Sequence, residues 1–257
     1  MSIFDYIRRF LNRSTKQRQE RQVAEFQRKF GIIFINSELL AEALTHRSYM
    51  KNCRNDVMSN ERLEFLGDSV LGLVTSEYLF KVHSDYNEGD LTKTKALLVN
   101  EQTLSLVGRD SGINEFIYLS PDEEKTGGRE RPSIISDCVE AIIGAIFLDQ
   151  GLQSARKFVN QILFSRSDMI LSDSSMRNYK GELLEYLQSK GIDPPQYEVV
   201  SEEGPDHEKT FKVVVYTQGE VTGYGKGLSK KDAEQKAAAD SLKCLFEKEK
   251  ETSKKQC

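Results

Sequence analysis

Two pairs of acidic residues within strongly apolar segments constrain the fold of this 257-residue chain more than any other feature. Glu64 and Asp68 lie four residues apart in NERLEFLGDSVL. Asp137 and Glu140 lie three residues apart in SDCVEAIIGAIFLD. Each spacing puts both carboxylates on one side of a helix, and carboxylates on a core helix need a cationic partner, a proton or a metal ion. Arg62 is the only cationic residue in either segment, so we expect a hard divalent ion such as Mg2+, which prefers oxygen ligands.

Composition excludes several classes of protein. The hydrophobic share is 38% and the charged share is 30%. No apolar run approaches the roughly 18 residues that span a bilayer, so we do not expect a membrane protein. The cysteines lie far apart without a CxxC pair, which favours neither a zinc site nor a disulfide framework. We therefore expect reduced thiols in a cytoplasmic protein.

Charge is distributed unevenly along the chain. Residues 1–31 carry a net charge of +5, residues 32–165 carry −7 and residues 166–257 carry −2. The acidic excess coincides with the expected metal site, so any binding of nucleic acid must depend on local basic patches. We interpret residues 1–24 as a basic amphipathic extension, which either packs on the main domain or contacts RNA or a membrane surface.

Residues 25–165 are predicted to form an all-helical domain. Apolar residues recur at helical spacing in five segments, which are 37–45, 60–81, 90–110, 134–149 and 152–164. Small residues occur near both acidic pairs, where they would let two helix backbones approach closely and bring the pairs together. These small residues are Gly67, Gly72, Ala141, Gly144 and Ala145.

A second, smaller domain is predicted after a serine-rich linker at residues 166–177. Over residues 178–247 the pattern changes to helix, three strands and helix. The expected elements are a helix at 180–190, strands at 196–203, 210–217 and 220–225, and a helix at 229–246. The fold class is therefore multidomain, an all-α domain followed by a small α+β domain, with a charged tail at 248–257.

From about residue 25 to 247 the chain resembles bacterial ribonuclease III. NERLEFLGDS is similar to that family's signature segment nearly letter for letter, and the later D-x-x-E falls where the family has its second acidic pair. The resemblance implies that Glu64, Asp68, Asp137 and Glu140 bind metal, with Asp68 and Glu140 as catalytic residues. It also implies two Mg2+ ions per active site, with Mn2+ as a substitute.

The resemblance implies supporting roles for Glu61 and Glu88 near a dimer interface. Phe65 is interpreted either as a core residue or as an aromatic knob set into a partner subunit. His46, in the segment THRS, is interpreted as a structural hydrogen-bonding group rather than a metal ligand, because a hard cation prefers oxygen. Cys138 lies inside the second acidic motif and is expected to face the core.

The carboxy-terminal domain resembles the double-stranded-RNA-binding domain, on the pattern GYGKGLSKKDAEQKAA. Lys230 and Lys231 at the helix start are expected to hold phosphates. The turn from Gly204 to His207, which includes Pro205, matches the family's minor-groove loop. Glu185 and Gln188 are the expected minor-groove contacts of the first helix. The chain departs from the family pattern at Leu184 and Glu234, where polar residues and lysine are respectively more usual, so the affinity of this domain alone is expected to be modest.

These features predict a homodimeric, Mg2+-dependent endoribonuclease that cuts double-stranded RNA to 5′-phosphate and 3′-hydroxyl ends. No Ser or Cys has a His at a suggestive spacing, so direct attack by water is favoured over a covalent intermediate. Processing of ribosomal-RNA precursors and of other structured transcripts, messenger RNA included, is the expected role. Two alternatives stay open: a non-catalytic RNA-binding adaptor, and a metal-dependent hydrolase of small phosphate esters.

Overall fold

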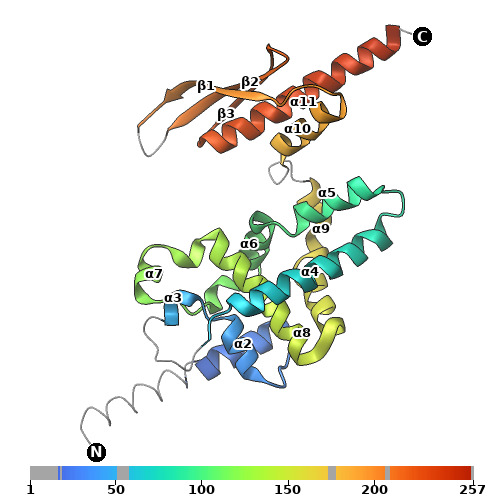
Figure 1. Cartoon of the computed structure of the whole chain (residues 1–257). Helices are drawn as coiled ribbons and strands as arrows, with labels where there is room; N and C mark the ends of the chain where they lie inside the picture. Colours follow the sequence, from blue (N-terminus) through green and yellow to red (C-terminus); the bar gives the residue numbers. More distant parts are fainter. Residues whose placement is uncertain (1–16, 18, 51–57, 173–177, 206–208, 256–257) are drawn as a thin grey trace, which may run out of the picture. The chain divides into compact units, whose positions relative to one another are not determined.

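The computed structural model describes residues 17, 19–50, 58–172, 178–205 and 209–255. The chain divides into two compact units, Met1–Met176 and Arg177–Cys257. The first unit is helical, and the second has the order helix, three strands, helix (Figure 1). The predicted fold class is thus confirmed. Most of the expected amino-terminal extension, residues 1–16 and 18, lies outside the described residues.

Helices account for nearly all regular structure in the described part of the first unit. The chain is helical over residues 19–30, and the later helices are α2 (Ser37–Ala43), α3 (Arg47–Met50), α4 (Glu61–Val82), α5 (Glu88–Leu98), α6 (Glu101–Asp110), α7 (Pro121–Lys125), α8 (Pro132–Ile162) and α9 (Ser167–Ser172). Short 3-10 helices span Asn114–Phe116 (η1), Gly128–Glu130 (η2) and Phe164–Arg166 (η3). Over the described residues, no helix has the length and apolar composition needed to cross a bilayer.

The structure corrects one predicted helix boundary and confirms another. The segment predicted as one helix at 90–110 is two helices, because the side chain of Asn100 accepts from Thr103 N–H at 2.8 Å and starts α6. The two helices predicted at 134–149 and 152–164 are confirmed, since they are the two halves of α8, which meet at a kink where Gly151 has non-helical backbone angles. Gly151 has a φ of 77°, a left-handed value that glycine adopts without steric cost. The short helices α3 and α7 were not predicted.

Helices α4 and α8 pack backbone to backbone. A Cβ on Gly67 would lie 1.8 Å from the carbonyl oxygen of Glu140, and one on Gly144 would lie 2.3 Å from the carbonyl oxygen of Leu63. The predicted close approach is therefore confirmed for these two glycines. Gly72 is different, since its nearest neighbour is the Lys95 side chain at 3.5 Å. The largest fully buried side chains in the core of the first unit include Phe26, Leu40, Leu71, Ile135, Ile142 and Phe158.

The second unit is a three-stranded antiparallel sheet with two helices. The strands β1 (Gln196–Glu203), β2 (Thr210–Thr217) and β3 (Glu220–Gly227) pair in the order β1-β2-β3. Helix α11 (Lys230–Lys255) packs on β2 and β3, and α10 (Tyr179–Ser189) packs on α11 (Figure 1). Glycines in β3 allow this contact, because a Cβ on Gly225 would lie 2.0 Å from the Ala233 carbonyl oxygen. The core consists of Leu183, Leu187, Val213, Val215, Ala233, Ala237, Ala238 and Leu242.

Candidate active site and RNA-binding residues

Among the described residues, the structure brings Glu64, Asp137 and Glu140 together as a possible metal site. Carboxylate oxygens of these three residues lie within 4.8 Å of one another, and each side chain is half-buried. Glu64 projects from the first turn of α4, and the other two project from α8. The contact at Gly67 and Gly144 sets this separation, because it removes the side-chain layer that normally keeps helices about 8–10 Å apart.

Asp68 lies one turn further along α4, at the edge of this group. Its side chain is exposed and is not one of the three residues within 4.8 Å. Its charge nevertheless acts on the group, since it helps to raise the pKa of Glu140. Of the four predicted carboxylates, the structure therefore clusters three and places the fourth within electrostatic reach.

The electrostatics of the cluster favour a bound cation. Burial raises the pKa of Glu140 to about 8, with further increases from the charges of Asp68, Glu64 and Asp137. Burial is also the main cause of the raised pKa values of Glu64 and Asp137. Mutual repulsion of half-buried carboxylates is relieved either by protons or by a divalent ion, and an all-oxygen donor set suits Mg2+. The residues present thus fit a hard metal ion.

Two charged residues near the cluster were not predicted from the sequence to belong to the site. The positive charge of Arg47 partly offsets the effect of burial, which raises the pKa of Glu64 and Asp137, and its guanidinium lies 3.8 Å from a carboxylate oxygen of Glu61. Glu101, at the start of α6, raises the pKa of Asp137. Arg47 follows His46 in the segment THRS, and this position next to a motif residue is the one local signal that could have indicated it. Glu101 had no local signal, because it comes close to Asp137 only through the packing of α6 on α8.

The supporting residues lie at helix starts or on the surface. Glu61 begins α4 and accepts from Ser59 Oγ at 2.9 Å, while Glu88 is exposed at the start of α5. Phe65 is 79% exposed, so its interpretation as a core residue is wrong. A large aromatic side chain at this exposure is available to a second protein surface.

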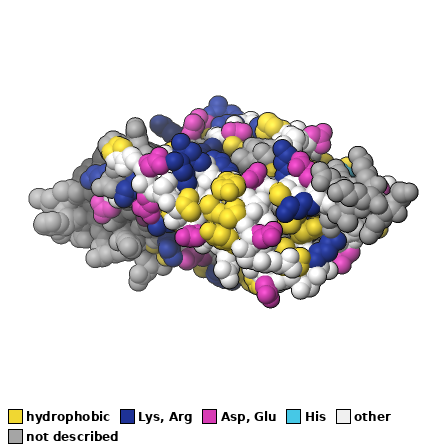
Figure 2. All heavy atoms as spheres, turned by 90° about the horizontal axis from the view of Figure 1, so that it is seen from above, with side chains coloured by type: hydrophobic (Ala, Val, Ile, Leu, Met, Phe, Trp, Pro, Cys, Tyr) yellow, Lys and Arg dark blue, Asp and Glu magenta, His cyan; other side chains and the backbone are white. Residues whose placement is uncertain are grey.

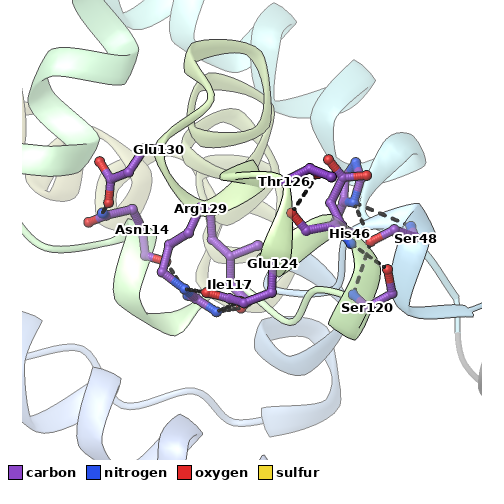
Figure 3. Close-up of polar contacts among 10 residues, drawn as sticks. His46, Ser48, Asn114, Ile117, Ser120, Glu124, Thr126, Arg129 and Glu130 are labelled. Carbon is purple, nitrogen blue, oxygen red and sulfur yellow. Dashed lines mark hydrogen bonds and ion pairs between the residues drawn. The ribbon is translucent and has the colours of Figure 1, made fainter.

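Cys138 and His46 have structural environments. Cys138 is fully buried and its Sγ lies 3.6 Å from the Ala43 carbonyl oxygen, which confirms that it faces the core. Figure 3 shows His46 beside Ser48 and Ser120. Nδ1 of His46 lies 2.9 Å from Ser48 Oγ, which in turn accepts from the backbone N–H of Ser120 at 3.1 Å. These hydrogen bonds support a structural role for His46.

The segment before α8 is held by Arg129 (Figure 3). Its guanidinium donates to both carboxylate oxygens of Glu124, at 2.7 and 2.6 Å. It also donates to the carbonyl oxygens of Asn114 at 2.6 Å and Ile117 at 3.1 Å. Because η2 leads directly into α8, this network restrains the start of the helix that carries Asp137.

The expected RNA-contacting residues that the structure describes all lie on the surface of the second unit. Glu185 and Gln188 are exposed on α10, Pro205 is exposed after β1, and Lys230 and Lys231 are exposed at the start of α11. His207 lies outside the described residues.

Both departures from the expected pattern have a place in the packing of the second unit. Leu184 is half-buried on α10. The carboxylate of Glu234 lies 2.6 Å from Nζ of Lys180, so it ties α11 to α10. The ammonium of Lys180 also lies 4.5 Å from the centre of the Tyr197 ring. Glu234 therefore has an internal cation as its partner.

Fold and site together define a class of protein: a helical domain with a clustered carboxylate site, combined with an α-β-β-β-α module. Family models agree, since residues 36–167 match the family described as Ribonuclease-III-like and residues 179–245 match the double-stranded RNA binding motif. The chain is 44% identical to Ribonuclease 3 of Desulforamulus reducens over 229 residues, 89% of this chain and 93% of that protein. It is also 44% identical to Ribonuclease 3 of Clostridium acetobutylicum, over 88% of this chain and 98% of that protein. The chain belongs to the ribonuclease III family.

A solved structure supports the assignment of the first unit. The nuclease domain of ribonuclease III from Campylobacter jejuni is 42% identical, with a TM-score of 0.50, over 54% of this chain and 94% of that chain. The protein is therefore an endoribonuclease of double-stranded RNA, and its family implies dependence on a divalent metal ion.

Proposed function

We propose that this endoribonuclease uses Mg2+ to hydrolyse duplex RNA to 5′-phosphate and 3′-hydroxyl ends. The observation that carries the proposal is the convergence of Glu64, Asp137 and Glu140 within 4.8 Å. These residues would hold the ion together with Asp68, and Asp68 and Glu140 are the catalytic residues. Two ions per active site, with Mn2+ as a substitute, are proposed on the family resemblance.

Each part of the site has a distinct task in this proposal. Bound Mg2+ supplies activation of water and stabilisation of negative charge on the phosphoryl group. The carboxylates would bind the ion and fix its position. Because burial raises the pKa values of Glu64, Asp137 and Glu140, binding of the cation would release protons from these groups. Arg47 limits the repulsion among them, because its positive charge partly offsets the burial that raises the pKa of Glu64 and Asp137.

A homodimer is part of the proposal. The nuclease domain of the Campylobacter jejuni ribonuclease III has a structurally flexible region involved in dimer formation. On α4 of this chain, Phe65, Leu73 and Phe80 are 79%, 56% and 73% exposed. Spacings of seven and eight residues place these apolar side chains on one side of the helix, which is the arrangement expected of a protein interface. Glu61 and Glu88 are proposed to lie beside it.

The biological substrate is proposed from the second unit and the family resemblance. A double-stranded-RNA-binding module reads A-form shape and 2′-hydroxyl groups rather than base sequence. Structured transcripts in the cytoplasm, such as ribosomal-RNA precursors and folded messenger RNA, present such duplexes. In this module Glu185, Gln188, Pro205 and His207 are proposed to contact the minor groove, and Lys230 and Lys231 to contact phosphates.

The test separates cutting from binding. Asp68→Asn and Glu140→Gln should nearly abolish cleavage of a labelled RNA duplex in Mg2+, while duplex binding in EDTA stays close to that of the unmodified chain. Glu115→Gln is the control, because Glu115 is an exposed acid that is not one of the clustered carboxylates. Normal cutting by both variants would refute the site. A chain that binds duplex RNA without cutting it would be an adaptor, and one that cleaves only nucleotides would be a small-ester hydrolase.

A further inference from the structure

Several lysines of the second unit are held by acidic side chains. Nζ of Lys230 lies 2.9 Å from a carboxylate oxygen of Glu202, and Nζ of Lys236 lies 2.8 Å from one of Asp232. Figure 2 shows that basic and acidic side chains are interspersed on one face of the molecule. RNA binding depends on lysine and arginine facing phosphates, so acids beside these lysines oppose it.

The pair between Lys230 and Glu202 is the one that coincides with a proposed phosphate contact. Lys230 begins α11, whereas Glu202 lies near the end of β1, next to the turn proposed to enter the minor groove. Phe211 faces Glu202 in the strand register, and the Lys230 ammonium lies 5.6 Å from the centre of its ring. The lysine is thus directed toward the carboxylate and the ring at the end of the sheet.

Both members of the pair are accessible to a ligand. The Lys230 and Glu202 side chains are 58% and 42% exposed. A phosphate bound at this ammonium would bring a second negative charge beside the carboxylate. Because the two anions repel each other, phosphate and the Glu202 carboxylate compete for the Lys230 ammonium. Because the ion pair is exposed, it is weak enough for RNA to displace the carboxylate. The free energy lost with the ion pair must nevertheless be subtracted from the free energy gained in the phosphate contact.

We propose that Glu202 competes with RNA phosphate for Lys230 and thereby lowers the affinity of this protein for duplex RNA. The proposal rests on the proposed role of Lys230 in phosphate binding and deepens it. It assigns Glu202, an acid in the strand before the minor-groove turn, as a residue that tunes substrate affinity without contacting the reacting phosphate.

The neighbouring residue Glu203 provides a matched control. Its carboxylate lies 2.6 Å from Nζ of Lys212 on β2, and alternation along the strand directs it to the other face of the sheet. Glu202→Gln and Glu203→Gln change the net charge equally, so only the first should free Lys230. We expect Glu202→Gln to bind an RNA duplex about two- to fivefold more tightly than the unmodified chain, the range of an exposed ion pair.

The measurement uses the full chain in EDTA, where no cutting occurs, with dissociation constants taken at several salt concentrations. Glu203→Gln should stay close to the unmodified chain, and the gain from Glu202→Gln should be largest at low salt. Thermal melting of all variants checks that they fold alike.

A double-variant cycle tests whether Lys230 transmits the effect. Combined with Lys230→Gln, the Glu202→Gln change should no longer tighten binding. Equal affinities of Glu202→Gln and Glu203→Gln, or a gain that persists without Lys230, would overturn the inference. If all these proteins bind RNA but the two acid variants do not differ, the inference alone fails. If none binds duplex RNA, the proposed function fails with it.

Discussion

At the scale of single residues, Glu140 is the carboxylate whose ionisation is most strongly opposed in the cluster. Burial and three acidic neighbours raise its pKa to about 8, against an ordinary value of 4.5. The folded, metal-free protein therefore keeps this proton at pH values where the unfolded chain has lost it. Folding stability from this group is fully present below about pH 4.5 and is lost as the pH rises through about 8.

This linkage predicts a pH-dependent effect of Glu140→Gln on stability in EDTA. Glutamine resembles the protonated acid and cannot ionise, so the variant should match the unmodified chain near pH 5. Near pH 9 it should melt about 2–4 °C higher, which corresponds to about 1 kcal/mol after allowance for solvent screening of this half-exposed group. Calorimetric melting at both pH values measures the difference. A gain of equal size at both pH values would contradict the raised pKa.

At the scale of elements, the contact between α4 and α8 is decided by two glycines. Gly67 and Gly144 face the opposing backbone at distances that leave no room for a Cβ. Sequence pattern indicated small residues at both helices but did not distinguish Gly67 from Gly72, since both lie on α4 near the acids. Gly72 meets only the flexible end of Lys95.

The same helix provides a variant and its control. Gly67→Ala should destabilise the first unit by about 1–3 kcal/mol or more, because the helices must separate to admit the methyl group. The separation should also disrupt the carboxylate cluster and strongly reduce RNA cutting. Gly72→Ala should instead stabilise by about 0.5–1 kcal/mol, the usual gain for alanine within a helix. Urea unfolding with a cleavage assay measures both, and equal behaviour of the two variants would contradict the close approach.

Predictions of helices from periodicity were weaker at element boundaries than within elements. Asn100 caps α6 and breaks a segment that periodicity predicted as one helix. At Gly151, by contrast, the predicted break is present, because the non-helical backbone angles of this residue divide α8 into two helical halves. In both cases one side chain or one backbone angle sets the boundary; apolar periodicity located the break near Gly151 but did not report the cap at Asn100.

At the scale of the whole molecule, exposure of Phe65 predicts self-association. A charge at this position should prevent the proposed dimer, because a buried, unpaired carboxylate at an interface costs more than the contact contributes. We expect Phe65→Glu to sediment as a monomer under conditions where the unmodified chain is a dimer. Ile35→Glu is the control, since Ile35 is 86% exposed and lies outside α4. A dimeric Phe65→Glu variant would exclude this surface as the interface.

The sequence by itself determined the chemical groups of the site and the order of the elements. Helical spacing placed Glu64 with Asp68 and Asp137 with Glu140, because the side of a helix that a residue occupies is a local property. Only the tertiary structure decided that Glu64, Asp137 and Glu140 converge while Asp68 stays at the edge. It also decided that Phe65 is exposed, that Arg47 acts on the cluster and that Glu202 holds Lys230. Each of these depends on the distance between segments far apart in the chain, which packing sets and local pattern does not encode.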